Sequence, residues 1–390
     1  MSDQTLRVLG TSVTLLDVVQ DLARRDLDID IEFDVRGGVE AQQKGILRPD
    51  DYDIYDQWFH SIDLLWTAGA IQPIQCDRLE FWEDIGNLTK FGSLNNGSNL
   101  GAGNRPMDIQ FVQEDGSLGS NPMPRISAVP TAYNADSFSY EPKLMPTTLE
   151  VGSESWGWLL SKEWRGKVGL NTDPSIGIAD MILAAQAMDL VEFEDVGNLS
   201  IEEIDALVDE LILLKKAGHF AGFWSTVKDS VDFMLKRKGR IGGIWSPAAS
   251  KLRARDVPVR IAAPIEGYRA WHSCLCLSSR LPPEKADAAY QYLNWWLSGR
   301  PGAVLARQGY YSSTPNKTKT NLSNSEWDYW YAGKPASEDL SDPQGRKIIK
   351  KGAVREGGSH QDRMSNIVMW NTLMDEQNYL VRRWSELLTA

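Results

Sequence analysis

The chain has 390 residues, long enough for two domains, and its 42% hydrophobic and 24% charged residues are typical of a soluble globular protein. Its formal net charge of −12 argues against nucleic acid as a partner and gives no attraction to an anionic membrane surface. The longest apolar runs fall far short of the ~18 residues that a membrane span needs.

The first hundred residues alternate between strand and helix patterns. Strands are predicted at 6–10, 28–35 and 52–58, and helices at 15–25, 39–47 and 61–71. This order predicts a parallel sheet with right-handed crossovers. Because ligands of such sheets bind beyond the carboxyl ends of the strands, we expect residues 10–12, 37–38 and 56–60 at the rim of a crevice.

A second α/β stretch follows a Gly-, Asn-, Ser- and Pro-rich segment at 86–125, which predicts a long loop. Strands are predicted at 167–171, 240–245 and 259–264, and helices at 178–188, 201–218 and 284–297. The pattern predicts a final amphipathic helix over 366–388.

The sequence contains no motif for a catalytic or metal centre. Cys274 and Cys276 lie two apart on a predicted strand, so they point the same way and are poorly placed to bridge each other. Zinc-type Cys and His spacings, a GxSxG, a P-loop and a strand-linked GxGxxG are absent. His272 and Cys274 share a face without nucleophile geometry. The sequence therefore predicts neither an enzyme nor a cofactor.

Six segments carry a resemblance, and they occur in the same order along most of the chain. They are YDIYDQWFHSIDLLWTAGAIQPI (52–74), AVPTAYNADSFSY (128–140), SWGWLLSKEWRGKVGL (155–170), GGIWSPAAS (242–250), PIEGYRAWHSCLCL (264–277) and GYYSSTPN (309–316). With these segments the chain resembles the periplasmic solute-binding proteins of ABC importers, particularly the spermidine/putrescine-binding group.

This resemblance implies an α/β, two-lobed periplasmic-binding-protein fold of type II, with mixed sheets and interlobe crossing strands. Such a fold closes on its ligand like a hinge. The predicted lobes are residues 1–130 with 266–316, and residues 131–265 with 317–390, with hinges near 129–133 and 264–272. The resemblance also implies a small-molecule ligand, an ABC permease as partner, a monomer and a periplasmic location. The start MSDQ, followed by the strand LRVLG, shows no signal-peptide apolar region, so a cytosolic protein and one lacking its signal both remain open.

The resemblance implies an aromatic wall for an organic cation, since each ring face is electron-rich. Positions that match the family's ring-bearing positions are Trp58, Phe59 or His60, then Tyr133, Trp245, Trp271, and Tyr310 or Tyr311. From these we select Trp58, His60, Tyr133, Trp245, Trp271 and Tyr311 as candidate ligand contacts.

The carboxylates that pair with amines in that family are missing here. By ungapped matching they fall on Pro174, Gly177 and Ser273, and a buried ammonium without a carboxylate is costly. Asp136 or Asp173 could replace one of them. This pattern argues against a polyamine.

Arg269 and His272 flank Trp271 instead, and an arginine fits a carboxylate or phosphate that a polyamine lacks. We therefore favour an amine-bearing zwitterion, with its acid at Arg269 and Ser273 donating to oxygens, or a quaternary ammonium compound. Alternatives remain: Arg269 exposed and paired with Glu266 or Asp136, and His272 purely structural. A polyamine despite the missing acids, and ferric iron on Tyr310 and Tyr311, also stay open.

Overall fold

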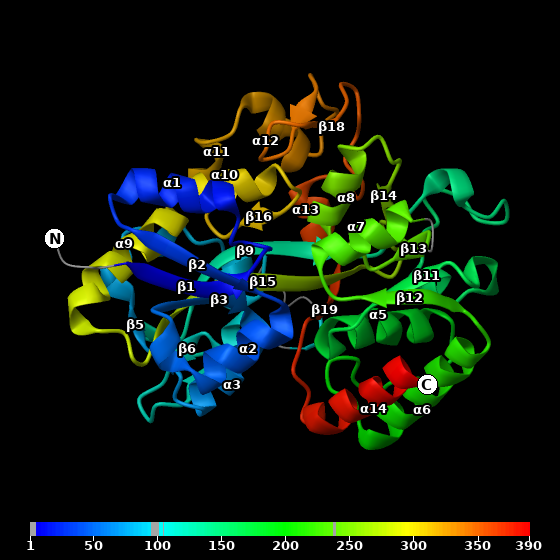
Figure 1. The fold of residues 1–390 in the computed structure, drawn as a ribbon, viewed down its shortest axis with the longest axis horizontal. Coiled ribbons are helices and arrows are strands. Elements are labelled where there is room, and N and C mark those ends of the chain that lie inside the picture. The colour runs from blue at the N-terminus through cyan, green and yellow to red at the C-terminus, as the bar shows by residue number, and fades with distance from the viewer. Residues whose placement is uncertain (1–4, 95–100, 104, 237–238) are drawn as a thin grey trace.

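The structure is a computed structural model that describes residues 5–94, 101–103, 105–236 and 239–390. Two mixed β-sheets, each with helices on both sides, lie side by side in Figure 1. The predicted two-lobed α/β organisation is confirmed. In the described ranges no helix is both long and apolar enough to cross a membrane.

The larger sheet has eight strands in the described chain, ordered β16–β9–β15–β3–β1–β2, with β4 and β19 also pairing with β15. Its strands are β1 (Leu6–Thr11), β2 (Ile31–Arg36), β3 (Ile54–Trp58), β4 (Ile71–Gln72), β9 (Val129–Asp136), β15 (Tyr268–Ser278), β16 (Tyr311–Ser312) and β19 (Ile367–Trp370). As predicted, β1 is parallel to β2 and β3, whereas β15 runs antiparallel to β3 and β9.

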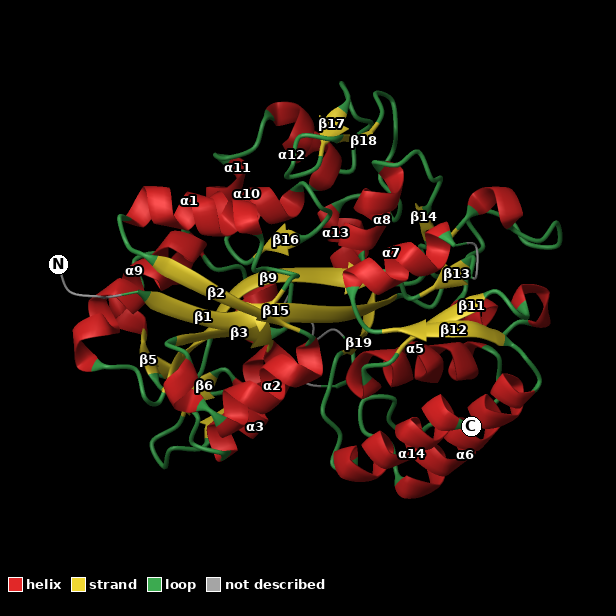
Figure 2. Cartoon of the chain, viewed as in Figure 1, coloured by secondary structure: helices red, strands yellow, loops and turns green. Residues whose placement is uncertain are grey.

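Helices cover both faces of this sheet because successive strand residues point to opposite sides. They are α1 (Asp17–Leu27), α2 (Gly38–Leu47), α3 (Ile62–Thr67), α9 (Ala286–Leu297) and α10 (Arg300–Ala306). Figure 2 shows α1 and α10 on one side and α2 and α3 on the other. Val8 and Ile54 belong to the core under α1 and α9, while their neighbours Leu9 and Tyr55 pack with α2 and α3.

The smaller sheet has the order β12–β11–β13–β10–β14. Its elements are β10 (Ser139–Tyr140), β11 (Val168–Asn171), β12 (Phe220–Trp224), β13 (Ile241–Gly242) and β14 (Arg260–Ile261), with helices α5 (Pro174–Ala187), α6 (Ile201–Lys216), α7 (Val227–Leu235) and α8 (Ser246–Arg253). A capping box between Ser200 and Glu203 starts α6, and Leu380 and Trp384 of α14 (Gln377–Thr389) join the same core.

Three segments of the described chain connect the two sheets and their helices: residues 137–138, residues 262–267, and residues 371–376, the last running from β19 to α14. β9 pairs with β15 through Asp136, and Ser139 of β10 already pairs in the smaller sheet. The return runs from β14, which ends at Ile261, to β15, which begins at Tyr268. Residues 131–136 thus lie in the larger sheet, and the lobe limits given above stay a prediction.

The remaining elements lie outside the two main sheets. They are β5 (Ile74–Gln75), α4 (Asn87–Phe91), β6 (Phe111–Val112), β7 (Leu118–Gly119), β8 (Arg125–Ile126), α11 (Pro315–Lys319), α12 (Asn324–Trp330), β17 (Leu340–Ser341), β18 (Lys347–Ile349) and α13 (His360–Met364). Strands β5 to β8 form a small sheet of their own, so the predicted loop at 86–125 contains ordered structure.

The predicted helix at 366–388 is wrong in its first part. Residues Ile367–Trp370 form β19, which pairs in parallel with β15, and the helix α14 begins only at Gln377. β-branched and aromatic side chains favour an extended strand where a partner edge is free, and this pairing overrides the helical spacing.

Candidate ligand-binding cleft

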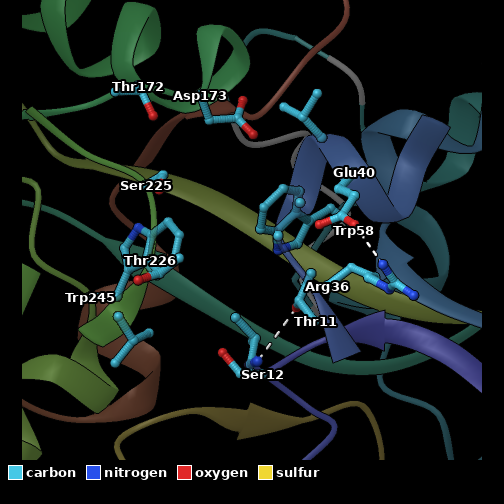
Figure 3. A pocket seen from close by; sticks show the side chains of 15 residues that line it. Thr11, Ser12, Arg36, Glu40, Trp58, Thr172, Asp173, Ser225, Thr226 and Trp245 are labelled. Atoms are coloured by element: carbon cyan, nitrogen blue, oxygen red, sulfur yellow. Dashed lines mark hydrogen bonds and ion pairs between the residues drawn. The ribbon is translucent and has the colours of Figure 1, made fainter. Parts of the chain in front are cut away.

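A cavity of about 280 Å³ lies between the two sheets, at the carboxyl ends of strands from both (Figure 3). It is lined by Thr11, Ser12, Val13, Arg36, Gly37, Gly38, Val39, Glu40, Trp58, Thr172, Asp173, Ser225, Thr226, Val227 and Trp245. The first nine follow or end β1, β2 and β3, and Thr172, Asp173, Ser225 and Thr226 follow β11 and β12. The rule that ligands bind beyond the carboxyl ends of the strands, here called the strand-end rule, therefore places this cleft correctly.

Two indoles, one from each sheet, form the aromatic part of the cleft (Figure 3). Trp58 ends β3, and Trp245 stands immediately before α8; their ring centroids are 6.4 Å apart and the planes are tilted by 70°. Trp224 supports Trp245 edge-on at 5.4 Å. Gly38 allows Trp58 to lie this close, because a side-chain carbon at Gly38 would come within 2.4 Å of the indole.

Asp173 is the acid that lines the cleft from the smaller sheet. It caps α5, accepting from the backbone N–H of Ser175 at 2.9 Å. Burial raises the pKa of Asp173 to about 6, while the backbone N–H groups of Ser175 and Ile176 oppose that rise. A side-chain carbon at Gly38 would lie 3.5 Å from its carboxylate, so the two lobes approach closely here.

Helix starts add positive electrostatic potential to the cleft. α2 begins at Gly38, and its N-cap, Gly37, offers no capping side chain, so its first backbone N–H groups lack a side-chain acceptor. Arg36 stands beside them and forms ion pairs with Asp34 and Glu40 at 2.5 and 2.7 Å. The mouth of the cleft thus combines backbone N–H donors and the Arg36 guanidinium with the carboxylate of Glu40.

A smaller cavity of about 10 Å³ continues inward past Val13, Trp58 and Trp245, which line both spaces. It also contacts Trp271 and Tyr310, whose rings meet edge-to-face with centroids 5.0 Å apart.

Asp136 also borders this inner cavity and is already hydrogen-bonded. Trp271 Nε1 and Asn134 Nδ2 each donate to it at 2.6 Å. Burial raises the pKa of Asp136, against the charge of Arg269 and these hydrogen bonds.

Arg269 lies at the inner end of the cleft and is 1% exposed. Its Nε donates to Asp180 Oδ1 at 2.8 Å and its Nη1 donates to Asn371 Oδ1 at 2.6 Å. The alternative of an exposed Arg269 paired with Glu266 or Asp136 is therefore wrong. Its Nη2, an NH2 group with two N–H donors, is buried and has no hydrogen-bond partner among the described residues.

His60 borders a separate cavity of about 300 Å³ on another side of Trp58. The imidazole is parallel to the Trp58 ring at 5.9 Å. Burial, and then the charge of Arg269, lower the pKa of His60 to about 3, so this histidine is neutral at physiological pH. The amides of Gln42 and Asn378 line the same space.

Tyr133 and Tyr311 border none of these three cavities. Their rings lie 5.6 Å apart, and the Tyr133 hydroxyl is 2.6 Å from His360 Nε2. Alternation along strands explains this: Asn134 and Asp136 face the cleft side of β9, so Tyr133 faces away. The same step makes Tyr310, the neighbour of Tyr311, the tyrosine at the inner cavity.

Ser273 is buried where β15 pairs with β3, opposite Trp58, and borders none of these cavities. His272 stacks on Phe59 with centroids 4.2 Å apart, and burial lowers its pKa to about 3. This arrangement agrees with the structural reading of His272.

Several cleft residues have only a weak signal in the sequence. Ser225 and Thr226 directly follow FAGFW, a short aromatic strand just before a helix, so the strand-end rule could have found them. Asn371 follows β19, which the helical pattern concealed. No local pattern points to Arg36 or Glu40.

A family model for bacterial extracellular solute-binding proteins matches residues 79–330. The chain belongs to this family. Proteins of the family bind small solutes and deliver them to ABC transporters through contact with the membrane permease, which implies a periplasmic or extracellular location. No curated protein sequence matches the chain.

Solved structures share the fold of this solute-binding protein at low identity. A putative spermidine/putrescine ABC transporter protein from Listeria monocytogenes has a TM-score of 0.67 at 12% identity, covering 99% of both chains. The spermidine/putrescine-binding protein PotD from Streptococcus pneumoniae, with calcium and HEPES, has 0.65 at 13% identity, covering 99% of this chain and 98% of its own. AgtB from A. tumefaciens R10, with agropinic acid, has 0.62 at 10% identity over 100% of both.

Proposed function

We propose that this protein binds an amine-bearing zwitterion or a quaternary ammonium compound between its lobes and delivers it from the periplasm to an ABC permease. The observation that carries the proposal is the convergence of Trp58, Trp245 and Asp173 on one cavity from both sheets. Each ring contributes roughly 0.5–2 kcal/mol to a cation, and the carboxylate supplies its counter-charge.

Two groups of hydrogen-bond donors in this arrangement can bind the acid end of a zwitterion. The free Nη2 of Arg269 lies at the inner end, and the uncapped start of α2 lies at the mouth. A ligand that contacts both lobes favours the closed form by its differential contacts, and the closed form is the one that docks on the permease. This role needs one copy of the chain and no catalytic group.

Polyamine binding is the second candidate, because Asp173 replaces one of the missing acids within the cleft. Asp136 is less available to an amine, since its carboxylate already accepts hydrogen bonds from Trp271 and Asn134. Of the similar structures, two carry spermidine/putrescine names and one holds agropinic acid, so the fold accommodates both ligand classes.

Ferric iron has little support. Adjacent strand residues point to opposite faces, and Tyr310 meets Trp271 while Tyr311 packs against Tyr133. Within the described ranges, no three His, Cys, Asp or Glu side chains gather as a metal site.

A thermal-shift panel tests the ligand class. It covers spermidine and putrescine, trimethylammonium compounds, amino acids, ω-amino acids, and di- and tricarboxylates. A ligand at 100 times its Kd adds about 2.7 kcal/mol to the folded state, which is readily seen. The proposal is supported if zwitterions or quaternary amines raise the melting temperature and polyamines do not. It is overturned if polyamines alone raise the melting temperature.

Calorimetry on Trp245→Ala tests the site itself. We expect at least a tenfold loss of affinity for the compound that the panel identifies, because the indole lines the cleft. Trp66→Ala is the matched control: this half-buried indole bonds to the Gly116 carbonyl at 3.0 Å, away from the cleft. Equal affinities of parent and Trp245→Ala would remove Trp245 from the site.

A further inference from the structure

A fourth cavity lies beside α8 and shares no lining residue with the three cavities described above. It is a cavity of about 10 Å³, room for one water-sized occupant. Arg253 and Ser250 of α8 line it on one side, and Arg355, Glu356 and Arg363 line it on the other. Three arginines and one carboxylate thus surround a space with room for one water molecule or one ion of similar size.

The charges around this cavity do not cancel. Arg253 Nη2 pairs with Glu356 Oε1 at 2.5 Å, which neutralises one arginine. Arg355 and Arg363 are 6% and 2% exposed. Asp136 also acts on Arg363, and with both Glu356 and Asp136 ionised the three arginines still keep one positive charge in excess.

The two remaining arginines are held by carbonyl oxygens and rings. Arg355 donates to the carbonyls of Gly309, at 2.8 Å, and Trp330. Arg363 donates to the carbonyls of Glu356 and Ala135 at 3.0 and 2.5 Å. Carbonyl dipoles satisfy donors without removing the net charge.

One donor of a lining arginine has no hydrogen-bond partner among the described residues. Arg363 Nε is buried and makes no hydrogen bond to any residue that the structure describes. The hydroxyls of Ser246 and Ser250, both nearly buried, line the same space and can turn their hydrogens toward an acceptor. A buried charged donor without an acceptor is rare and indicates an ion or water at that place.

We infer that this cavity binds one small monovalent anion, a halide such as chloride. The excess positive charge favours an anion over a water molecule. The size of the space excludes sulfate and phosphate, which need several times the room of one water. The anion joins α8, whose start carries Trp245, to the turn at Gly309 and to the segment before α13.

Crystals grown or soaked in sodium bromide test the site directly. Anomalous diffraction at the bromine edge is expected to show a peak within hydrogen-bond distance of Arg363 Nε and the serine hydroxyls. An empty anomalous map at this cavity, or density refined as water alone, overturns the inference.

Thermal melting tests it in solution. At equal ionic strength, chloride and bromide are expected to raise the Tm by at least about 2 °C over gluconate. Sulfate is too large for the cavity, so it is expected to change the Tm only through its general salt effect. The halide gain is expected to vanish in Arg363→Gln and to persist in Arg78→Gln, whose guanidinium stacks on Tyr290 at 3.7 Å. If Arg363→Gln does not fold, the bromide map decides; equal Tm values of the parent protein in chloride and gluconate contradict the inference.

Discussion

Two groups of aromatic side chains in this molecule differ in their surroundings. Trp58, Trp245, Trp271 and Tyr310 border cavities between the sheets. Tyr133, Tyr311, Tyr331 and His360 pack against one another, with Tyr311 fully buried and 4.7 Å from the His360 ring. We call the second set the tyrosine cluster.

Residues that are neighbours in the sequence belong to different groups. Tyr310 belongs to the cleft and Tyr311 to the tyrosine cluster, and on β9 the cleft side carries Asn134 and Asp136 while Tyr133 faces away. Because side chains alternate across a strand, a shift of one position exchanges a cavity-lining residue for a packing residue. Cleft residues should therefore change affinity, and cluster residues should change stability.

Tyr311→Ala should have the largest effect and tests the cluster side of this comparison. Removing a fully buried ring that packs on Tyr133 and Tyr331 should lower the free energy of unfolding by about 3–5 kcal/mol, measured by urea denaturation. The affinity for the bound solute should stay within about twofold, since no bond to the cleft is lost. Tyr379→Ala, at the partly exposed face of α14, is the control and should cost about 1 kcal/mol or less. A tenfold loss of affinity in Tyr311→Ala would show that the tyrosine cluster also supports solute binding.

Asp56→Asn should give the next largest effect, seen as a change in pH dependence. Asp56 is fully buried, and neither of its carboxyl oxygens has a well-aligned hydrogen bond to the described residues. Burial raises its pKa to about 8, against a smaller lowering by the nearby Thr14 hydroxyl. The folded state thus keeps a proton that the unfolded state, with a pKa near 3.8, releases.

The stabilising effect of this proton is complete below about pH 4 and is lost as the pH rises toward 8. The free energy of unfolding should fall by up to about 1.4 kcal/mol per pH unit in that window. Asparagine resembles the protonated acid, so Asp56→Asn should remove this part of the slope, whereas the exposed control Asp115→Asn should retain it. Equal slopes for parent and Asp56→Asn in denaturant titrations at several pH values would show that Asp56 is ionised.

Trp271→Ala tests the inner cavity. Because its indole borders that cavity and donates to Asp136, we expect at least a tenfold loss of solute affinity, about 1.4 kcal/mol, with the fold retained. Trp295→Ala is a close control, since Trp295 Nε1 donates to Asp26 at 3.0 Å and its ring lines none of the cavities around the cleft. Calorimetry that finds both variants equal in affinity would assign Trp271 to packing alone.

The sequence was sufficient for the fold and for the general position of the cleft. The strand–helix alternation and the strand-end rule located Thr11, Gly38 and Trp58 correctly, because they depend on local pattern. Trp245, chosen through the resemblance, lies opposite Trp58 in the same cavity. Whether these residues contact a solute stays a prediction.

The details that the sequence did not reveal depend on partners distant in the chain. Arg269 is paired with Asp180, 89 residues earlier on α5, and no spacing in the sequence reveals that pair. The choice between Tyr310 and Tyr311 required the register of β16 against β9, which tertiary pairing fixes. The sequence did not reveal strand β19 because its stability depends on pairing with the start of β15, which β3 leaves free.

Asp173 should give the smallest effect, and it tests whether the cation lies beside this carboxylate. With its pKa raised to about 6 by burial, Asp173 is mostly protonated at pH 5 and ionised at pH 7.5. A cationic solute prefers the ionised form, so affinity should rise between these pH values by about fivefold to tenfold. His60 and His272, with pKa values lowered to about 3, stay neutral throughout and do not contribute. Isothermal titration at both pH values should show the rise in the parent and a flat response in Asp173→Asn; a flat parent would place the cation elsewhere along the aromatic wall.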